Sequence, residues 1–305
     1  MVNIYEILRG DKDENGDYQK QPVIVQGITG KYGSEHTKLM MDYGTNIAAG
    51  VTPGKGGQKF ENTVPIYNTV KEAIDASGAQ IAIMFVPAKF FLDAAKEALD
   101  AGIKLLVAIP EHVPIRDAMQ TIELVKQKNA IMIGPNTPEV IIPDLIKVGI
   151  MPASPFSAGK IAVLSKSGTL LYEISNNLTS AGVGQNITIG IGGDPVNGTR
   201  MIDAFDMVKD EPDLEGMVVV GEIGGEAEEV LAQHIIDSGF KKPIIGYIAG
   251  RRAPKEKRMG HAGAIIMGTY GSAESKIDMF TKANIPVAKR PGEIAILLAG
   301  KMNSQ

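Results

Sequence analysis

Short apolar runs alternate with longer stretches of helical spacing along the first half of the chain, from Pro22 onward. The runs predicted as buried strands are Val23–Gln26, Ile47–Ala49, Ile81–Val86, Leu105–Ile109 and Ile131–Ile133. The predicted helices include Ser34–Tyr43, Lys89–Ala101 and Ile115–Gln127. This alternation predicts a parallel sheet that is covered by helices on both faces.

A proline-rich passage interrupts this rhythm and marks a domain junction, because proline suits neither a helix interior nor a central strand. Its prolines are Pro135, Pro138, Pro143, Pro152 and Pro155. A second alternation follows, with predicted strands Ile161–Leu164, Ile187–Ile191, Met217–Val220 and Ile244–Ile248. Its predicted helices are Leu170–Ala181, Met201–Lys209, Ala227–Ser238 and Ser272–Ala283.

Two Rossmann-like α/β halves therefore explain the pattern better than one barrel does. The expected division is a polar N-terminal extension over residues 1–21, a first domain over 22–150 and a second over 151–305.

Composition narrows the class of protein. The chain has 305 residues, 44% of them apolar and 22% charged, which is enough to bury a core. A net charge of −4 argues against a general nucleic-acid binder, and no apolar run is long enough to span a membrane. The absence of cysteine excludes thiol chemistry within the chain. The polar start lacks the pattern of a secretion or transit signal, so we expect a cytoplasmic protein.

Two glycine-rich loops follow the first two predicted strands. Gly27–Gly33 opens a helix, so its backbone N–H groups and the helix N-terminus suit a phosphate, although a tight turn is the alternative. Gly50–Gly57 carries Lys55 where a nicotinamide-dependent enzyme needs an acidic residue for the ribose. A lysine there suits an additional phosphate, such as the one on the adenosine ribose of coenzyme A. Neither loop is a nucleoside triphosphate-binding P-loop.

The second half of the chain carries three further candidate segments. Ser165–Thr169, with Lys166, follows a strand and opens a helix, which suits a phosphoryl group or else a simple N-cap. His261 lies between Gly260 and Gly263, and such a histidine serves as a base, ligand or nucleophile, or has a structural role.

Glu222 ends a predicted strand and is able to reach His261 at the same edge of the sheet, unless it caps a helix. The other histidines are His36, His112 and His234. No two of the four histidines have metal-ligand spacing, so we predict no metal site.

Taken together, these segments resemble the succinate–CoA ligase (succinyl-CoA synthetase) alpha-subunit family from about Val23 to Lys301. The segments that carry the resemblance are Gly27–Gly30, Gly50–Gly57, Gly134–Asn136, Ser165–Thr169, Gly192–Pro195, Gly221–Gly225 and Gly260–Ala264. The resemblance implies a Rossmann-like CoA-binding domain and then a flavodoxin-like doubly wound ligase domain.

The family's chemistry implies that NTP phosphorylates a histidine, which passes the phosphoryl group to succinate, and CoA then displaces phosphate. An ATP-grasp beta subunit is expected to hold ATP or GTP and Mg²⁺, in an alpha–beta heterodimer or heterotetramer. The implied setting is the tricarboxylic acid cycle.

The family's motifs assign roles residue by residue. The resemblance implies that His261 is the phosphorylated histidine and that Glu222 lies beside it. The residues implied to contact CoA are Thr29, Gly30, Lys31, Tyr32, Lys55, Ile109, Pro110 and Glu111. The residues implied to contact the acid are Tyr172, Asn136 and Thr137, and those implied to contact phosphate are Ser165, Ser167, Gly168 and Thr169.

The sequence departs from the family pattern at four positions, one of which is Asp144, where a glycine usually follows the proline. Pro110 replaces a threonine, Thr137 replaces a cysteine, and Glu139 replaces a glycine in the loop expected to face the acid. We expect Glu139 to point to solvent, which leaves succinate as the substrate. If Glu139 instead pairs with a cation, the pocket is wider or takes a hydroxylated acid.

Other functions are alternatives to this one. A ligase for citrate or malate uses the same chemistry, a non-catalytic CoA-binding module lacks the second domain, and a nicotinamide oxidoreductase shares the Rossmann fold.

Overall fold

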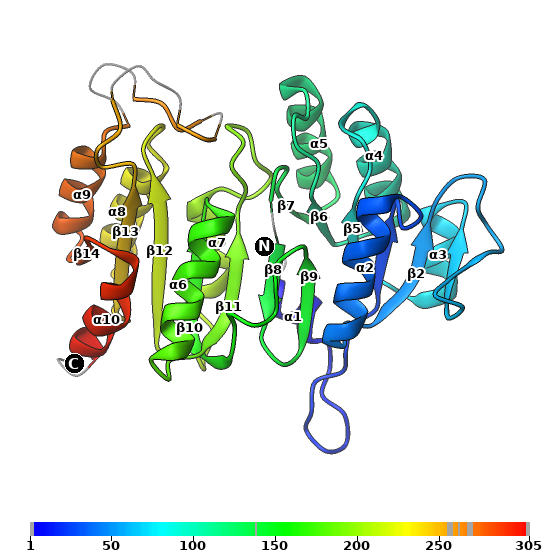
Figure 1. Ribbon diagram of the computed structural model, residues 1–305, viewed down its shortest axis with the longest axis horizontal. Helices are drawn as coiled ribbons and strands as arrows, with labels where there is room; N and C mark the ends of the chain where they lie inside the picture. The colour runs from blue at the N-terminus through cyan, green and yellow to red at the C-terminus, as the bar shows by residue number, and fades with distance from the viewer. Residues whose placement is uncertain (1–2, 138, 255–258, 262, 267–270, 303–305) are drawn as a thin grey trace. The chain divides into compact units, whose positions relative to one another are not determined.

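The computed structural model describes residues 3–137, 139–254, 259–261, 263–266 and 271–302 (Figure 1). The chain divides into two compact units. The first comprises Met1–Met151 and Val196–Thr199, and the second comprises Pro152–Pro195 and Arg200–Gln305. None of the helices in the described part of the chain is both long and apolar enough to cross a membrane.

The first unit contains one mainly parallel sheet in the order β3-β4-β2-β1-β5-β6-β7. Its strands are β1 Val23–Gln26, β2 Ile47–Val51, β3 Lys59–Phe60, β4 Val64–Tyr67, β5 Ile81–Met84, β6 Leu105–Ala108 and β7 Ile131–Ile133. Apart from the antiparallel edge strand β3, this is the strand order of a Rossmann fold, and the order reverses between β1 and β5. The predicted Rossmann-like domain is confirmed.

Helices cover both faces of this sheet. They are α2 Lys31–Tyr43, α3 Val70–Ser77, α4 Phe91–Ala101 and α5 Ile115–Gln127. Figure 1 shows α2 on the near face and the other three helices behind the sheet. The core between the sheet and these far helices is almost purely aliphatic, with Ile24, Ala82, Leu99 and Leu106 among its buried residues. Strands that are covered on both faces need apolar residues at every position, which explains their continuous apolar runs.

The N-terminal segment of the first unit contains a short helix that we did not predict, α1 Ile4–Arg9. Asn3 caps it by accepting a hydrogen bond from the Tyr5 N–H, and Ile4 and Leu8 are fully buried. The residues near the end of the unit form an antiparallel hairpin, β8 Glu139–Ile142 and β9 Ile146–Gly149, which was not predicted either.

The second unit contains parallel strands in the order β14-β13-β12-β10-β11. Their bounds are β10 Ala158–Ser165, β11 Gln185–Gly190, β12 Gly216–Glu222, β13 Ile244–Ala249 and β14 Val287–Ala288. This is the strand order of flavodoxin-like folds, with the reversal between β10 and β12. The predicted flavodoxin-like doubly wound domain is confirmed.

Five helices of the described chain cover this second sheet. They are α6 Gly168–Ser180, α7 Met201–Val208, α8 Ala227–Ser238, α9 Ala273–Lys282 and α10 Ile294–Met302. In Figure 1, α6 and α10 lie in front of the sheet, and α8 and α9 lie behind it. The buried side chains Val163, Ile174, Val218 and Leu298 join the strands to the front helices in one core.

The predicted helix Lys89–Ala101 differs in detail from the observed one. Residues Ala88–Phe90 form a single 3₁₀ turn (η1), and the α-helix begins at Phe91. Pro87 immediately precedes this turn and lacks an N–H donor, which favours a tight entry into the helix.

Candidate functional site

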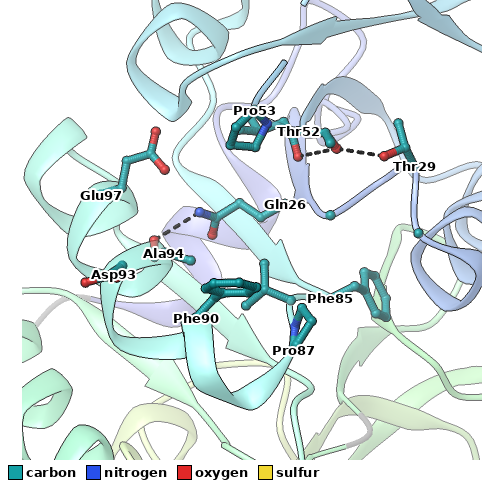
Figure 2. A pocket seen from close by; sticks show the side chains of 14 residues that line it. Gln26, Thr29, Thr52, Pro53, Phe85, Pro87, Phe90, Asp93, Ala94 and Glu97 are labelled. Carbon is teal, nitrogen blue, oxygen red and sulfur yellow. Dashed lines mark hydrogen bonds between the residues drawn. The ribbon is translucent and has the colours of Figure 1, made fainter. Parts of the chain in front are cut away.

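The first candidate site is a pocket of about 490 Å³ at the reversal of strand order in the first unit (Figure 2). It lies outside the carboxyl ends of β1, β2 and β5, where open α/β sheets bind their ligands. Its lining residues are Gln26, Gly27, Thr29, Gly30, Val51, Thr52, Pro53, Phe85, Val86, Pro87, Phe90, Asp93, Ala94 and Glu97.

Close backbone packing explains why two positions of the first loop are occupied by glycine. Gly27 has φ of +83°, and a Cβ there would lie 2.7 Å from the Phe85 carbonyl oxygen. A Cβ on Gly33 would lie 2.3 Å from the Gly27 carbonyl oxygen. Only glycine lets α2 begin this close to the loop, so its N-terminus comes directly to the pocket.

The start of α2 is arranged as an anion site. The N-cap residue, Gly30, has no side chain to occupy the first N–H groups of the helix. These N–H groups and the helix dipole attract negative charge. Beside them, the Thr29 hydroxyl donates to the Thr52 hydroxyl oxygen over 3.2 Å, which ties the first loop to the second (Figure 2).

Of the residues predicted to contact CoA, only Thr29 and Gly30 line this pocket. Lys55 is exposed in the loop beyond Thr52, and the Lys55 N–H donates to the Thr52 carbonyl oxygen over 3.0 Å. The remaining predicted residues, which do not line it, are Lys31, Tyr32, Ile109, Pro110 and Glu111.

Tyr32 lies close to several carboxylates. Its side chain packs edge-on against Phe85, with 5.9 Å between the ring centroids. Burial and the negative charges of Glu111, Glu35 and Glu139 raise the pKa of the Tyr32 hydroxyl, so this group stays protonated at neutral pH.

Sequence reasoning missed the far wall of the pocket, which comes from β5 and α4. Phe85, Pro87 and Phe90 supply apolar surface, and Asp93 and Glu97 add carboxylates. The Glu97 carboxylate accepts the Val70 N–H over 2.8 Å and so joins α4 to the start of α3. The sequence did contain a signal for this wall, because Phe85–Pro87 lie at the end of a predicted strand and parallel strands end at a common edge, where ligands bind.

The loop predicted to contact the acid lies in the first unit. The Asn136 N–H donates to the Pro110 carbonyl oxygen over 3.0 Å, so this loop packs against the stretch predicted to contact CoA. Thr137 is 3% exposed, and its hydroxyl oxygen accepts the Glu139 N–H over 3.2 Å. Pro138, between them, lies outside the described residues.

The expectation that Glu139 points to solvent is wrong. Its side chain is 0% exposed. In the hairpin register Glu139 lies opposite Gly149 and Ile141 opposite Lys147, so Glu139 and Lys147 project from the same face. Burial lowers the pKa of Lys147, and the Glu139 carboxylate opposes that shift. The positive charge of Lys147 within the same hairpin favours this carboxylate electrostatically, while the Lys147 ammonium group donates its hydrogen bond to the Met151 carbonyl oxygen over 2.9 Å.

The second candidate site lies wholly within the second unit, where the order of its strands reverses. Glu222 ends β12, and its carboxylate oxygen Oε2 lies 2.8 Å from His261 Nδ1. Their side chains are 12% and 31% exposed, respectively. The structure thus brings together two residues that are 39 positions apart. The alternative role of Glu222 as a helix cap is not observed, because Glu226 is the N-cap of the following helix, α8.

Neighbouring charges favour the protonated imidazole. The hydrogen bond to Glu222 is the main reason that the pKa of His261 is raised above its usual 6.5, and the charge of Asp194 acts in the same direction. Burial and the positive charge of Lys166 oppose this shift. An imidazole held in this way has a fixed orientation, with Nδ1 toward Glu222.

Glycines allow the loops of this site to touch. A Cβ on Gly193 would lie 2.6 Å from His261 Cδ2, so the imidazole ring packs directly over that glycine. A Cβ on Gly224 would lie 1.9 Å from the Gly263 carbonyl oxygen. Lys257, Arg258 and Ala262 of the histidine segment lie outside the described residues.

The predicted phosphate loop lies between β10 and α6. The Ser165 hydroxyl donates to the Ser167 carbonyl oxygen over 2.8 Å and accepts the Ser167 N–H over 3.1 Å. Ser167 is the N-cap of α6, and its hydroxyl oxygen accepts the Leu170 N–H. This is the N-cap that the sequence offered as the alternative to a phosphate site. Gly168 and Thr169 begin the helix, and Tyr172 lies one turn further along it. The other backbone N–H groups of this first turn suit an anion, as at other helix N-termini.

Comparison with known proteins gives two family matches and close curated relatives. Residues 18–112 match the CoA binding domain, and residues 164–284 match the CoA-ligase domain. The chain is 49% identical over 279 residues to the succinate–CoA ligase [ADP-forming] subunit alpha of Aquifex aeolicus, covering 91% of each protein. It is 47% identical over 281 residues to subunit alpha 2 of the corresponding enzyme of Archaeoglobus fulgidus, covering 92% of this chain and 97% of the relative.

Solved structures share the fold at lower identity. ATP citrate lyase from Methanothrix soehngenii, in complex with citrate and coenzyme A, matches with a TM-score of 0.83 at 23% identity. That match covers 93% of this chain and 50% of the lyase chain, so the present chain spans half of the lyase. A dinucleotide-forming acetyl-coenzyme A synthetase of Ca. Korarchaeum cryptofilum matches with a TM-score of 0.75 at 17% identity, over 99% of this chain and 63% of that one.

Proposed function

Because the chain belongs to the succinate–CoA ligase alpha-subunit family, we propose that it forms succinyl-CoA from succinate, CoA and a nucleoside triphosphate by way of phosphorylated His261. Membership makes the chain a subunit of a CoA ligase. The observation that carries the proposal is the pairing of His261 Nδ1 with Glu222 at the end of β12, because β12 pairs with β10, the strand that leads into α6.

The geometry suits His261 as a nucleophile. Glu222 holds the Nδ1 side of the ring, which leaves Nε2 as the nitrogen that attacks phosphorus. Nε2 displaces the nucleoside diphosphate and takes the phosphoryl group. The Glu222 carboxylate stabilises the positive charge that the imidazole then carries. The N–H groups of Gly168 and Thr169 at the start of α6 suit the phosphoryl oxygens.

The two later steps consume this phosphoryl group. A succinate carboxylate oxygen attacks phosphorus, the bond to Nε2 breaks, and succinyl phosphate forms. The CoA sulfur then attacks the acyl carbon, inorganic phosphate leaves, and the thiol proton passes to phosphate or water. We assign CoA to the pocket of the first unit, with its phosphates at the α2 N-terminus and near Lys55.

A partner completes the enzyme in this proposal. The relatives are named as alpha subunits, and we propose an ATP-grasp beta subunit that binds ATP or GTP with Mg²⁺. The Mg²⁺ supplies charge neutralisation for the nucleotide phosphates. We further propose that the pair acts in the cytoplasm.

Buried Glu139 favours a second candidate acid. The carboxylate lies directly after the loop of Asn136 and Thr137, and carboxylate oxygens accept hydrogen bonds from hydroxyl groups. A hydroxylated acid such as malate or citrate is therefore the alternative substrate.

The test is CoA-dependent phosphate release by the reconstituted alpha–beta pair with succinate, malate and citrate. Dominant turnover of succinate supports the main proposal, and dominant turnover of malate or citrate supports the alternative. No CoA-dependent phosphate release with any of the three acids contradicts both. Repeating the panel with Glu139→Gly shows whether Glu139 selects the acid: the change should shift the preference toward succinate under the alternative and should leave succinate turnover nearly unchanged under the main proposal.

A further inference from the structure

A buried group of charges lies directly behind His261 and Glu222. The Glu228 side chain on α8 is 0% exposed, and its Oε1 accepts the Glu222 N–H over 3.2 Å. The ammonium groups of two lysines contact this same carboxylate, Lys276 from α9 and Lys166 from the loop before α6. A single carboxylate therefore joins the backbone of Glu222 to two cations.

The two lysines differ in how firmly they are held. Lys276 is fully buried, and its ammonium group contacts Glu228, Glu229 Oε2 at 3.0 Å and the Gly225 carbonyl oxygen at 3.0 Å. An ammonium group has three donors, so these contacts use all of them. Lys276 is thus a fixed partner of Glu228, and it holds the turn that follows Glu222.

Lys166 is held more loosely. Its side chain is 19% exposed, and its Nζ lies 3.4 Å from Glu228 Oε1. Its positive charge lowers the pKa of His261, so the ammonium group acts on the imidazole as well. Of the two cations on Glu228, Lys166 comes from the loop that opens the α6 anion site.

Phosphorylation of His261 changes the charge balance at this place. A phosphoryl group adds a charge of about −1.5 to −2 near neutral pH, in a partly buried site. The ion pair between Glu228 and Lys276 does not depend on Lys166. If Lys166 leaves Glu228, the buried Glu228 carboxylate is therefore still paired with a cation. A charge-assisted contact to phosphoryl oxygen is also shorter and stronger than an ion pair at 3.4 Å.

We infer that Lys166 is a catalytic residue that changes partners during turnover. Its ammonium group pairs with the Glu228 carboxylate in the free enzyme and with the phosphoryl group on His261 in the phosphorylated enzyme. Lys276 is a positioning residue whose positive charge balances the Glu228 carboxylate before and after this exchange. This inference rests on the proposed function, because it needs a phosphorylated His261.

The experiment uses the alpha–beta holoenzyme and γ-labelled nucleotide. The rate of acid-labile labelling is measured for the wild-type enzyme, Lys166→Met, Lys166→Arg and the control Lys282→Met, an exposed lysine on α9. Lys166→Met should label about a hundredfold more slowly, which is typical for the loss of one electrostatic donor. Lys166→Arg should recover most of the rate, and Lys282→Met should match the wild type.

A second measurement separates a direct contact from a structural effect. The phosphorus-31 signal of the phosphoenzyme is titrated with pH for the wild type, Lys166→Met and Lys166→Gln. A cation in contact with the phosphoryl group lowers its pKa, so both variants should titrate at higher pH than the wild type. If Lys166→Met folds poorly, Lys166→Gln supplies the same comparison.

The outcomes distinguish the inference from the proposed function. If the wild-type enzyme acquires no label on His261, the proposed function fails. If the wild type is labelled but the Lys166 variants label at its rate and titrate at its pH, the exchange of Lys166 is refuted while the proposed function stands.

Discussion

At the scale of single residues, the chemistry depends on how charges are placed around His261. A carboxylate 2.8 Å from Nδ1 favours the imidazolium form, whereas burial and Lys166 disfavour it. The raised pKa shows that the carboxylate has the larger effect. A histidine that alternates between a neutral nucleophile and a positively charged phosphoramidate needs such a partner on one ring nitrogen.

Replacing Glu222 should therefore change the titration of His261. Glu222→Gln should lower the pKa of His261, because burial and Lys166 are then opposed only by the charge of Asp194. The NMR signals of the imidazole, followed with pH, measure this directly. Glu226→Gln, an exposed change at the N-cap of α8, serves as the control. An unchanged midpoint in Glu222→Gln contradicts the assigned cause.

The same pairing makes folding stability depend on pH. The pKa of His261 is raised in the folded state, so the extra stability is fully present below pH 6.5. It is lost as the pH rises through the raised folded value. Glu222→Gln should remove this part of the pH dependence, as measured by urea unfolding at several pH values.

Lys55 is the residue-scale test of the CoA assignment. Lys55→Ala should weaken CoA binding by about 1.5–3 kcal/mol, the value of a charge-assisted hydrogen bond, and it should reduce discrimination between CoA and dephospho-CoA. Calorimetry with both ligands measures this, with Lys126→Ala on α5 as the control. Unchanged affinity for CoA would show that Lys55 has no role, and unchanged discrimination alone would place Lys55 at the pyrophosphate.

At the scale of elements, each candidate site is built from a strand end, a glycine turn and a helix N-terminus. The helices α2 and α6 are both 13 residues long, and both begin at a candidate anion site. They differ in their caps, because Gly30 leaves the first turn of α2 open whereas the Ser167 hydroxyl occupies one N–H of α6. The fit of a helix start to its loop therefore decides whether a ligand can approach.

Gly33→Ala tests this fit. The added methyl group would lie 2.3 Å from the Gly27 carbonyl oxygen, so α2 or the loop must shift. CoA affinity should fall about tenfold or more, since displaced donors no longer match the ligand. Gly300→Ala on α10 is the matched control, because no described atom outside the helix's own backbone and the neighbouring residues lies within 4 Å of the new methyl group. Equal CoA affinity in both variants would contradict the proposed role of the α2 N-terminus.

At the scale of the whole molecule, the two candidate sites belong to different units. Phosphorylation of His261 and binding of CoA should consequently be separable. His261→Asn should abolish ligase turnover and acid-labile labelling while it keeps wild-type affinity for CoA. Lys55→Ala should weaken CoA binding while it keeps labelling at the wild-type rate.

This separation is measured by calorimetry with CoA and by labelling of the holoenzyme with γ-labelled nucleotide. Circular dichroism confirms that each variant is folded. Substantial turnover by His261→Asn would refute the phosphohistidine, and loss of CoA affinity in that variant would refute the independence of the two sites.

The alternation of strands and helices could be predicted from the sequence, because strands covered on both faces are continuously apolar over Ile81–Met84 and Met217–Val220. The glycine loops of the candidate sites were also evident, since their spacing after strands is a local feature. Short or mixed segments such as α1 and the β8–β9 hairpin were missed, because their stability comes from packing rather than from periodicity.

Only the tertiary structure decided which side chains meet and which are buried. The sequence by itself determined the family, the two α/β halves and the presence of Glu222 and His261 at loop positions. Three features depend on residues that are far apart in the chain: the strand order, the 2.8 Å contact between Glu222 and His261, and the ion pair between Glu228 and Lys276. The burial of Glu139 was decided in the same way, because acidic side chains are mostly exposed and only the pairing of β8 with β9 places this one in the interior, on the same hairpin face as Lys147.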